Sequence, residues 1–116
     1  MILFDTSVWI EHLRRGDSRL ITALEENNVA IHSAIVGELA CGNIPDRNKF
    51  LVDLRSLHEI EETSTSDTLE FISNHRLYGK GLGWVDMQLL ASALVSNAEL
   101  VTYDKRLAKA LDTLRL

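Results

Sequence analysis

A chain of 116 residues can bury one hydrophobic core and has no room for a second, so we expect a single domain over residues 1–116. Its net charge of -5 argues against a protein that holds nucleic acid mainly through a surplus of basic side chains, and no apolar run approaches the length of a membrane span. Cys41 is the only cysteine, so an intrachain disulfide cannot form. We therefore expect a cytoplasmic protein without membrane association, in which Cys41 is a small packing residue.

The first half of the chain predicts two strands that each pass directly into a helix. The apolar run at residues 2–4 has the composition of a buried parallel strand, and Asp5 ends it. Helices are predicted at 8–14 and at about 18–26, with Gly16 between them. A second strand is predicted at 29–32, and Ser33 is the expected cap of a helix that reaches residue 42.

The second half of the chain continues the alternation. Pro45 starts a helix that runs to about residue 57, residues 58–60 are a weak strand candidate, and the polar cluster at 63–68 caps a helix that extends through Leu77. Three glycines at 79, 81 and 83 then lead into a helix around Asp86. The last elements are a strand at 99–103 and a helix at 105–114.

This alternation of strands and helices predicts an α/β fold, a three-layer α/β/α sandwich around a short, mainly parallel sheet. In such sheets, ligand sites lie beyond the carboxyl ends of the strands. Asp5 and Asp104 each follow a predicted strand, and we expect Glu38 and Asp86 in the first turns of two helices. The sequence thus predicts that four acids converge at one edge of the sheet.

Two of these acids have unexpected neighbours. Asp86 shares a helix face with Leu89, Leu90, Ala93 and Leu94, while Gln88, Ser92 and Ser96 mark the opposite face, which we expect to be polar. A carboxylate that faces a core needs a partner or a metal, although an acid in a first turn also interacts favourably with the helix dipole.

Glu38 likewise has small or apolar residues three and four positions away on both sides, which is unusual for a solvated glutamate. The alternative is that Glu38 marks the polar edge of an amphipathic helix. For Asp104 the alternative is an N-cap, since a helix is predicted to begin at residue 105.

Four clustered carboxylates repel one another, and a divalent cation relieves that repulsion. Oxygen ligands without His or Cys select Mg2+ or Mn2+ over zinc, and the four histidines of the chain lack zinc-site spacing. One or two such ions in an acidic site support hydrolysis of phosphodiester bonds. The hydroxyls of Thr6 and Thr102 are candidates for orienting the metal ligands or their waters, or else they serve in caps and turns.

Four segments together resemble one family: DTSVWI at 5–10, GELACG at 37–42, GWVDMQLLASA at 83–93 and LVTYDKRL at 100–107. The chain resembles the PIN-domain ribonucleases, and most closely the VapC-type toxins of type II toxin-antitoxin systems. The resemblance implies a PIN-like fold and an Mg2+- or Mn2+-dependent endoribonuclease. It assigns metal binding and catalysis to Asp5, Glu38, Asp86 and Asp104. It also assigns to the hydroxyls of Thr6 and Thr102 the orientation of these ligands.

The same resemblance implies an RNA substrate, a homodimer and a cognate antitoxin that covers the active-site groove. Basic side chains are few, and Lys80, Lys105 and Arg106 are the candidates for contacts with RNA phosphates. Two alternatives stay open at this stage. One is a PIN-fold nuclease of RNA processing that has no antitoxin, and the other is a non-catalytic metal-binding α/β module.

Overall fold

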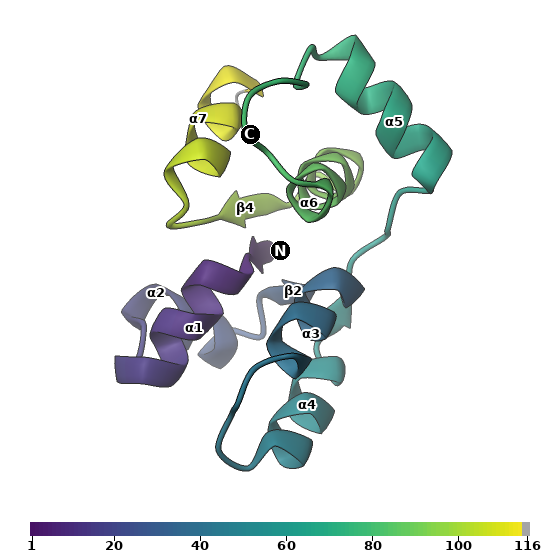
Figure 1. Ribbon diagram of the computed structural model, residues 1–116. Coiled ribbons are helices and arrows are strands. Elements are labelled where there is room, and N and C mark those ends of the chain that lie inside the picture. The colour runs from purple at the N-terminus through teal and green to yellow at the C-terminus, as the bar shows by residue number, and fades with distance from the viewer. Residues whose placement is uncertain (115–116) are drawn as a thin grey trace.

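The protein is built around a four-stranded, all-parallel sheet, as the computed structural model of residues 1–114 shows (Figure 1). The strand order is β3-β2-β1-β4, so the first and last strands of the chain are neighbours. Leu3 of β1 lies opposite Ala30 of β2 on one side and Leu100 of β4 on the other. The strands are β1 (Ile2–Phe4), β2 (Val29–Ile31), β3 (His58–Glu59) and β4 (Glu99–Val101).

Seven helices in residues 1–114 surround this sheet. In Figure 1, helices α1 to α4 group at one end of the molecule and α5 to α7 at the other. The fold is the predicted three-layer α/β/α sandwich with a parallel sheet. None of these helices combines the length and the hydrophobicity that crossing a membrane requires. The helices are α1 (Thr6–Arg15), α2 (Ser18–Glu25), α3 (Ser33–Ala40), α4 (Arg47–Arg55), α5 (Thr65–Asn74), α6 (Trp84–Val95) and α7 (Lys105–Leu114).

The hydrophobic core stabilises β1, although this central strand has only three residues. Leu3 and Phe4 of β1 are fully buried, because helices cover both faces. Leu20, Leu90 and Leu107, from three different helices, are also fully buried. Each such side chain contributes about 1.5–3 kcal/mol through removal from water. Burial of β1 fixes where the chain emerges at Asp5.

Helix α6 differs from the prediction of one apolar and one polar face. Ser92 is fully buried, whereas Leu94 is 40% exposed. The reason is that α6 packs against both β4 and α5, so a single apolar stripe does not describe it. The Ser92 hydroxyl is tolerated in the core because it accepts a hydrogen bond of 3.3 Å from the backbone N–H of Thr63.

Three local predictions were also wrong. His32, rather than Ser33, caps α3, because its ring Nδ1 accepts a 3.0 Å hydrogen bond from the N–H of Ala34. Cys41 is exposed, because α3 turns that side toward solvent. Helix α5 ends at Asn74, so Leu77 is buried from the following segment and not from the helix.

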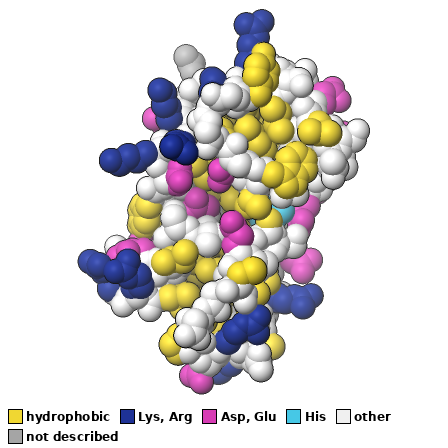
Figure 2. Space-filling view, in the orientation of Figure 1, with side chains coloured by type: hydrophobic (Ala, Val, Ile, Leu, Met, Phe, Trp, Pro, Cys, Tyr) yellow, Lys and Arg dark blue, Asp and Glu magenta, His cyan; other side chains and the backbone are white. Residues whose placement is uncertain are grey.

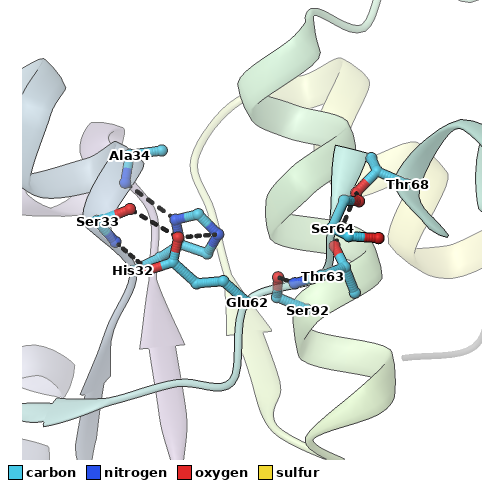
Figure 3. A network of polar contacts seen from close by, with 8 residues as sticks. All are labelled: His32, Ser33, Ala34, Glu62, Thr63, Ser64, Thr68 and Ser92. Atoms are coloured by element: carbon cyan, nitrogen blue, oxygen red, sulfur yellow. Dashed lines mark hydrogen bonds and ion pairs between the residues drawn. The ribbon is translucent and has the colours of Figure 1, made fainter. Parts of the chain in front are cut away.

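A polar network joins α3 to α5 and α6 (Figure 3). His32 is buried, and its Nε2 lies 3.7 Å from Glu62 Oε1. Glu62 also accepts hydrogen bonds from the backbone N–H and the hydroxyl of Ser33, at 3.1 and 2.7 Å. Thr63 follows directly and donates to Ser92. The network therefore fixes the start of α3 relative to α6, and these two helices carry Glu38 and Asp86.

Burial lowers the pKa of His32, and the charge of Glu62 opposes that shift in part. A histidine whose pKa is lower in the folded state takes up its proton more readily when unfolded. Its contribution to stability is therefore complete above the unfolded pKa of about 6.5 and declines as the pH falls below that value toward the folded pKa.

We predict that His32→Asn reduces the loss of stability between about pH 7 and pH 5, since Asn retains an N-cap acceptor but does not titrate. Urea unfolding followed by circular dichroism at several pH values measures this loss. The matched control is His58→Asn, at an exposed histidine of β3, which should keep the wild-type pH dependence. An unchanged slope in His32→Asn would show that this histidine does not govern acid stability.

Candidate active site

Asp5 lies at the carboxyl end of β1, in the middle of the sheet, and is only 6% exposed. Its side chain caps α1 by accepting a 3.0 Å hydrogen bond from the N–H of Ser7. The hydroxyls of Ser7 and Thr102 donate to its two carboxylate oxygens, the latter at 2.6 Å. Asp5 is therefore a buried carboxylate that is held by Ser7 of α1 and by Thr102, the residue after β4.

Asp104 follows β4 and is exposed. Its Oδ1 accepts hydrogen bonds from the N–H groups of Arg106 and Leu107, at 2.9 and 3.0 Å, which confirms that it caps α7. Its own N–H donates to the hydroxyl of Thr102, which in turn donates to Asp5. The two aspartates are thus joined through one threonine.

Glu38 differs from the prediction in two respects. It lies in the second turn of α3, because the helix begins at Ser33, and its side chain is exposed. The small neighbours that suggested a buried environment, Cys41 and Gly42, are themselves exposed. The hydroxyl of Thr6 donates to Glu38 Oε1 at 2.6 Å, which holds the carboxylate toward the start of α1.

Asp86 is half-buried in the first turn of α6, where its Oδ2 accepts a 2.9 Å hydrogen bond from the N–H of Gly83. Burial raises the pKa of Asp86, and the Gly83 hydrogen bond opposes that change. The negative charges of the three other acids raise this pKa further, with Asp104 contributing more than Asp5 or Glu38. The structure therefore brings the three other carboxylates within electrostatic range of Asp86.

The four side chains do not form a closed coordination shell. Within residues 1–114, no three His, Cys, Asp or Glu side chains form a group that could hold a metal ion directly. Each carboxylate is held by its own helix N-terminus or hydroxyl donor, as described above. However, Mg2+ usually keeps several water ligands and needs only one or two carboxylates. The all-oxygen donors and the charge repulsion at Asp86 fit such a hydrated cation.

Acidic side chains gather in the middle of the face shown in Figure 2, and Lys and Arg side chains lie beside them over α7. Of the three candidates for RNA contacts, Lys80 and Arg106 line one cavity of about 330 Å³ together with Lys109. Lys105 is exposed and does not line that cavity. Lys109 was missed, although its position three residues after Arg106 places both on one helix face.

Tyr103 and Ser7 are further residues whose contacts the sequence did not reveal. The Tyr103 hydroxyl donates to Asp17, the N-cap of α2, and its backbone N–H donates to the Ser7 hydroxyl at 3.0 Å. These contacts join positions that are 86 and 96 residues apart. No local pattern signals such pairs, because only the order of the strands brings β4 next to β1.

The sequence of this chain matches a known family and two curated relatives. The PIN domain family model matches residues 2–111. Two curated relatives, both named Ribonuclease VapC32, come from Mycobacterium tuberculosis strains CDC 1551 / Oshkosh and ATCC 25618 / H37Rv. Each is 45% identical to this chain over 111 residues, a match that covers 95% of this chain and 90% of the relative.

We predict that Asp86→Asn raises the melting temperature of the metal-free protein at neutral pH by a few degrees, because the amide removes one negative charge and retains an acceptor for Gly83. The same substitution should reduce the stabilisation produced by added Mg2+. Calorimetry with and without Mg2+ tests both effects.

The matched control for this substitution is Glu70→Gln, which changes an exposed acid of α5. It should respond to Mg2+ like the wild type. If Asp86→Asn melts at a lower temperature and responds to Mg2+ normally, then Asp86 does not share a cation with the other acids.

Proposed function

We propose, from the premise that this chain belongs to the PIN-domain family and is of the VapC type, that it is a Mg2+- or Mn2+-dependent endoribonuclease that hydrolyses RNA phosphodiester bonds as the toxin of a toxin-antitoxin pair. The observation that supports the metal-dependent part is the gathering of the four acids: Asp5 and Asp104 are joined through Thr102, and the charges of the three other acids add to the burial that raises the pKa of Asp86. Such a site repels the phosphates of RNA until a cation balances its charge.

Asp5, Glu38, Asp86 and Asp104 would hold the cation, directly or through water. Such a cation would supply activation of a water molecule for attack and stabilisation of the negative charge that develops on the phosphate. Side chains of the protein itself orient these carboxylates. Thr6 fixes the Glu38 carboxylate, and Thr102 fixes Asp5 and the backbone at Asp104.

We predict that Asp5→Asn and Asp86→Asn each reduce RNA cleavage by at least about a hundredfold, because each removes a charge that the cation requires. Cleavage of total cellular RNA by purified protein with Mg2+ or Mn2+, followed by sequencing of the new RNA ends, measures the rate and the target. EDTA should abolish the activity of the wild type.

Glu70→Gln is the matched control for these substitutions and should cleave at the wild-type rate. Circular dichroism establishes that each variant is folded. Full activity in both folded aspartate variants would falsify the site assignment, and undiminished cleavage in EDTA would exclude metal dependence.

A groove of this chain next to Glu38 is a suitable binding surface for the proposed antitoxin. This groove of about 300 Å³ between α1 and the end of α3 is lined mainly by apolar side chains, and Glu38 is one of its lining residues. Ile10 and Leu13 in this groove are 47% and 40% exposed. An apolar segment of a partner can fill the groove, and an Arg or Lys from it can pair with the carboxylates, so that antitoxin and metal compete.

We predict that Leu13→Glu weakens inhibition by the protein encoded next to this chain's gene, since a charge in the groove opposes an apolar partner. Inhibition is measured as the antitoxin concentration that halves RNA cleavage, with each variant compared to its own uninhibited rate. The control is Leu69→Glu, at an exposed position of α5 that is outside the groove. Equal inhibition of both variants would place the antitoxin elsewhere.

Two further elements belong to this proposal. We infer a cytoplasmic homodimer. Exposed apolar side chains such as Val52 and Tyr78 support the dimer. Light scattering of the purified protein tests the dimer. The alternative function is a PIN-fold RNA-processing nuclease without an antitoxin, which the absence of an inhibitory neighbouring gene product would favour.

A further inference from the structure

Asp17 is a buried carboxylate outside the group of four acids, and it is only 8% exposed. Its Oδ1 caps α2 by accepting a 3.0 Å hydrogen bond from the N–H of Leu20, and its own N–H donates to His12 Nδ1 at 3.1 Å. Within residues 1–114, its side chain forms no ion pair with a Lys, Arg or His. A carboxylate removed from water in this way needs a hydrogen-bond donor for its second oxygen.

Tyr103 is the donor to that second oxygen. Its hydroxyl donates to Asp17 Oδ2, and this hydrogen bond lowers the pKa of Asp17. The acceptor is therefore ionised at neutral pH, which makes the bond charge-assisted and stronger than a bond between neutral groups. Tyr103 itself is 54% exposed, so this bond, and not burial in the core, fixes the end of its side chain.

The backbone of Tyr103 is joined to the candidate active site through Ser7. The N–H of Tyr103 donates to Ser7 Oγ at 3.0 Å, and Ser7 Oγ donates to Asp5 Oδ1. A serine hydroxyl has a single proton, so a hydroxyl that accepts from a backbone N–H can direct its own proton to the carboxylate. The position of Tyr103 thus influences the position of the hydroxyl that orients Asp5.

Tyr103 lies in the middle of a short segment, residues 102–104, that belongs to neither β4 nor α7. The residue before it, Thr102, donates to Asp5 at 2.6 Å, and the residue after it is Asp104. Two of the four acids therefore depend on the position of this segment. Because residues 102–104 lie beyond the end of β4, the hydroxyl contact of Tyr103 helps to hold them against the start of α2.

We propose that Tyr103 and Asp17 are positioning residues, which hold Asp5 (through Ser7) and the segment 102–104 in the arrangement that binds the divalent cation. This inference rests on the proposed metal-dependent function and adds to it two residues that act on the site through others. Removal of a group that orients a metal ligand typically weakens metal binding by about ten- to a hundredfold. Loss of the Tyr103 hydroxyl should therefore weaken the site without altering any of the four acids.

The test measures the Kd of Mn2+ for the purified protein without RNA, from the electron paramagnetic resonance signal of free Mn2+. Tyr103→Phe removes the hydroxyl and keeps both the ring and the N–H that donates to Ser7. It should raise the Kd of Mn2+ about tenfold. The matched control is Tyr78→Phe, at a tyrosine between α5 and α6 that is 64% exposed, and it should keep the wild-type Kd. Circular dichroism establishes that each variant is folded at the temperature of the measurement.

Asp17→Ser removes the same contact from the other side. Serine is a favoured N-cap residue, so α2 keeps its cap, but the cap occupies the single side-chain oxygen. This variant should weaken Mn2+ binding as much as Tyr103→Phe does. The double variant should show no further loss, because both substitutions remove one and the same contact.

A purely structural role would lower the melting temperature of Tyr103→Phe and leave the Kd of Mn2+ unchanged. That result would overturn the proposal, and so would equal weakening by Tyr78→Phe or additive losses in the double variant. If Asp17→Ser does not fold, Tyr103→Phe and its control decide the question alone. A wild-type protein that fails to bind Mn2+ would instead count against the proposed metal dependence, and this inference would fall with it.

Discussion

Repulsion among four carboxylates at one edge of the sheet is the constraint on which the arrangement of this protein depends. The order β3-β2-β1-β4 places the ends of β1 and β4 side by side. Asp5 and Asp104 are therefore joined through Thr102, although they lie 99 positions apart in the sequence. Helices α3 and α6 add Glu38 and Asp86. Burial raises the pKa of Asp86, and repulsion from the three other acids raises it further.

The fold tolerates this repulsion by giving the carboxylates hydrogen-bond donors from outside the cluster. Asp5 and Asp104 accept N–H groups at the starts of α1 and α7, and Asp86 accepts the N–H of Gly83. Partial positive charge at these helix N-termini favours the ionised form. The same contacts hold the acids apart, and this spacing agrees with the hydrated cation proposed above.

The sequence predicted the features that depend on neighbours along the chain. The strand at residues 2–4 and the helix of residues 105–114 were found, and the strand predicted at 29–32 is one residue shorter in the structure, because burial patterns act over a few residues. Asp104 caps that helix, as the alternative to metal binding had it. The sequence did not predict that Ser92 is buried or that His32 caps α3. The burial of Ser92 involves Thr63, which only tertiary packing brings close. The cap at His32 is a local contact with Ala34, but histidine is not among the residues that favour N-caps.

Net charge is likewise a property of the whole chain that does not describe each of its surfaces. The net charge of -5 argues against nucleic-acid binding through a surplus of basic residues. The structure shows instead that acidic and basic side chains occupy separate regions. Acids occupy the ends of the central strands, while Lys80, Arg106 and Lys109 surround a cavity next to them. Because Asp104 and Arg106 are joined by a hydrogen bond, any ligand that spans the two regions meets both charges within one turn of α7. Under the proposed function, the uniformly negative backbone of RNA would require a cation on the acidic side and none on the basic side.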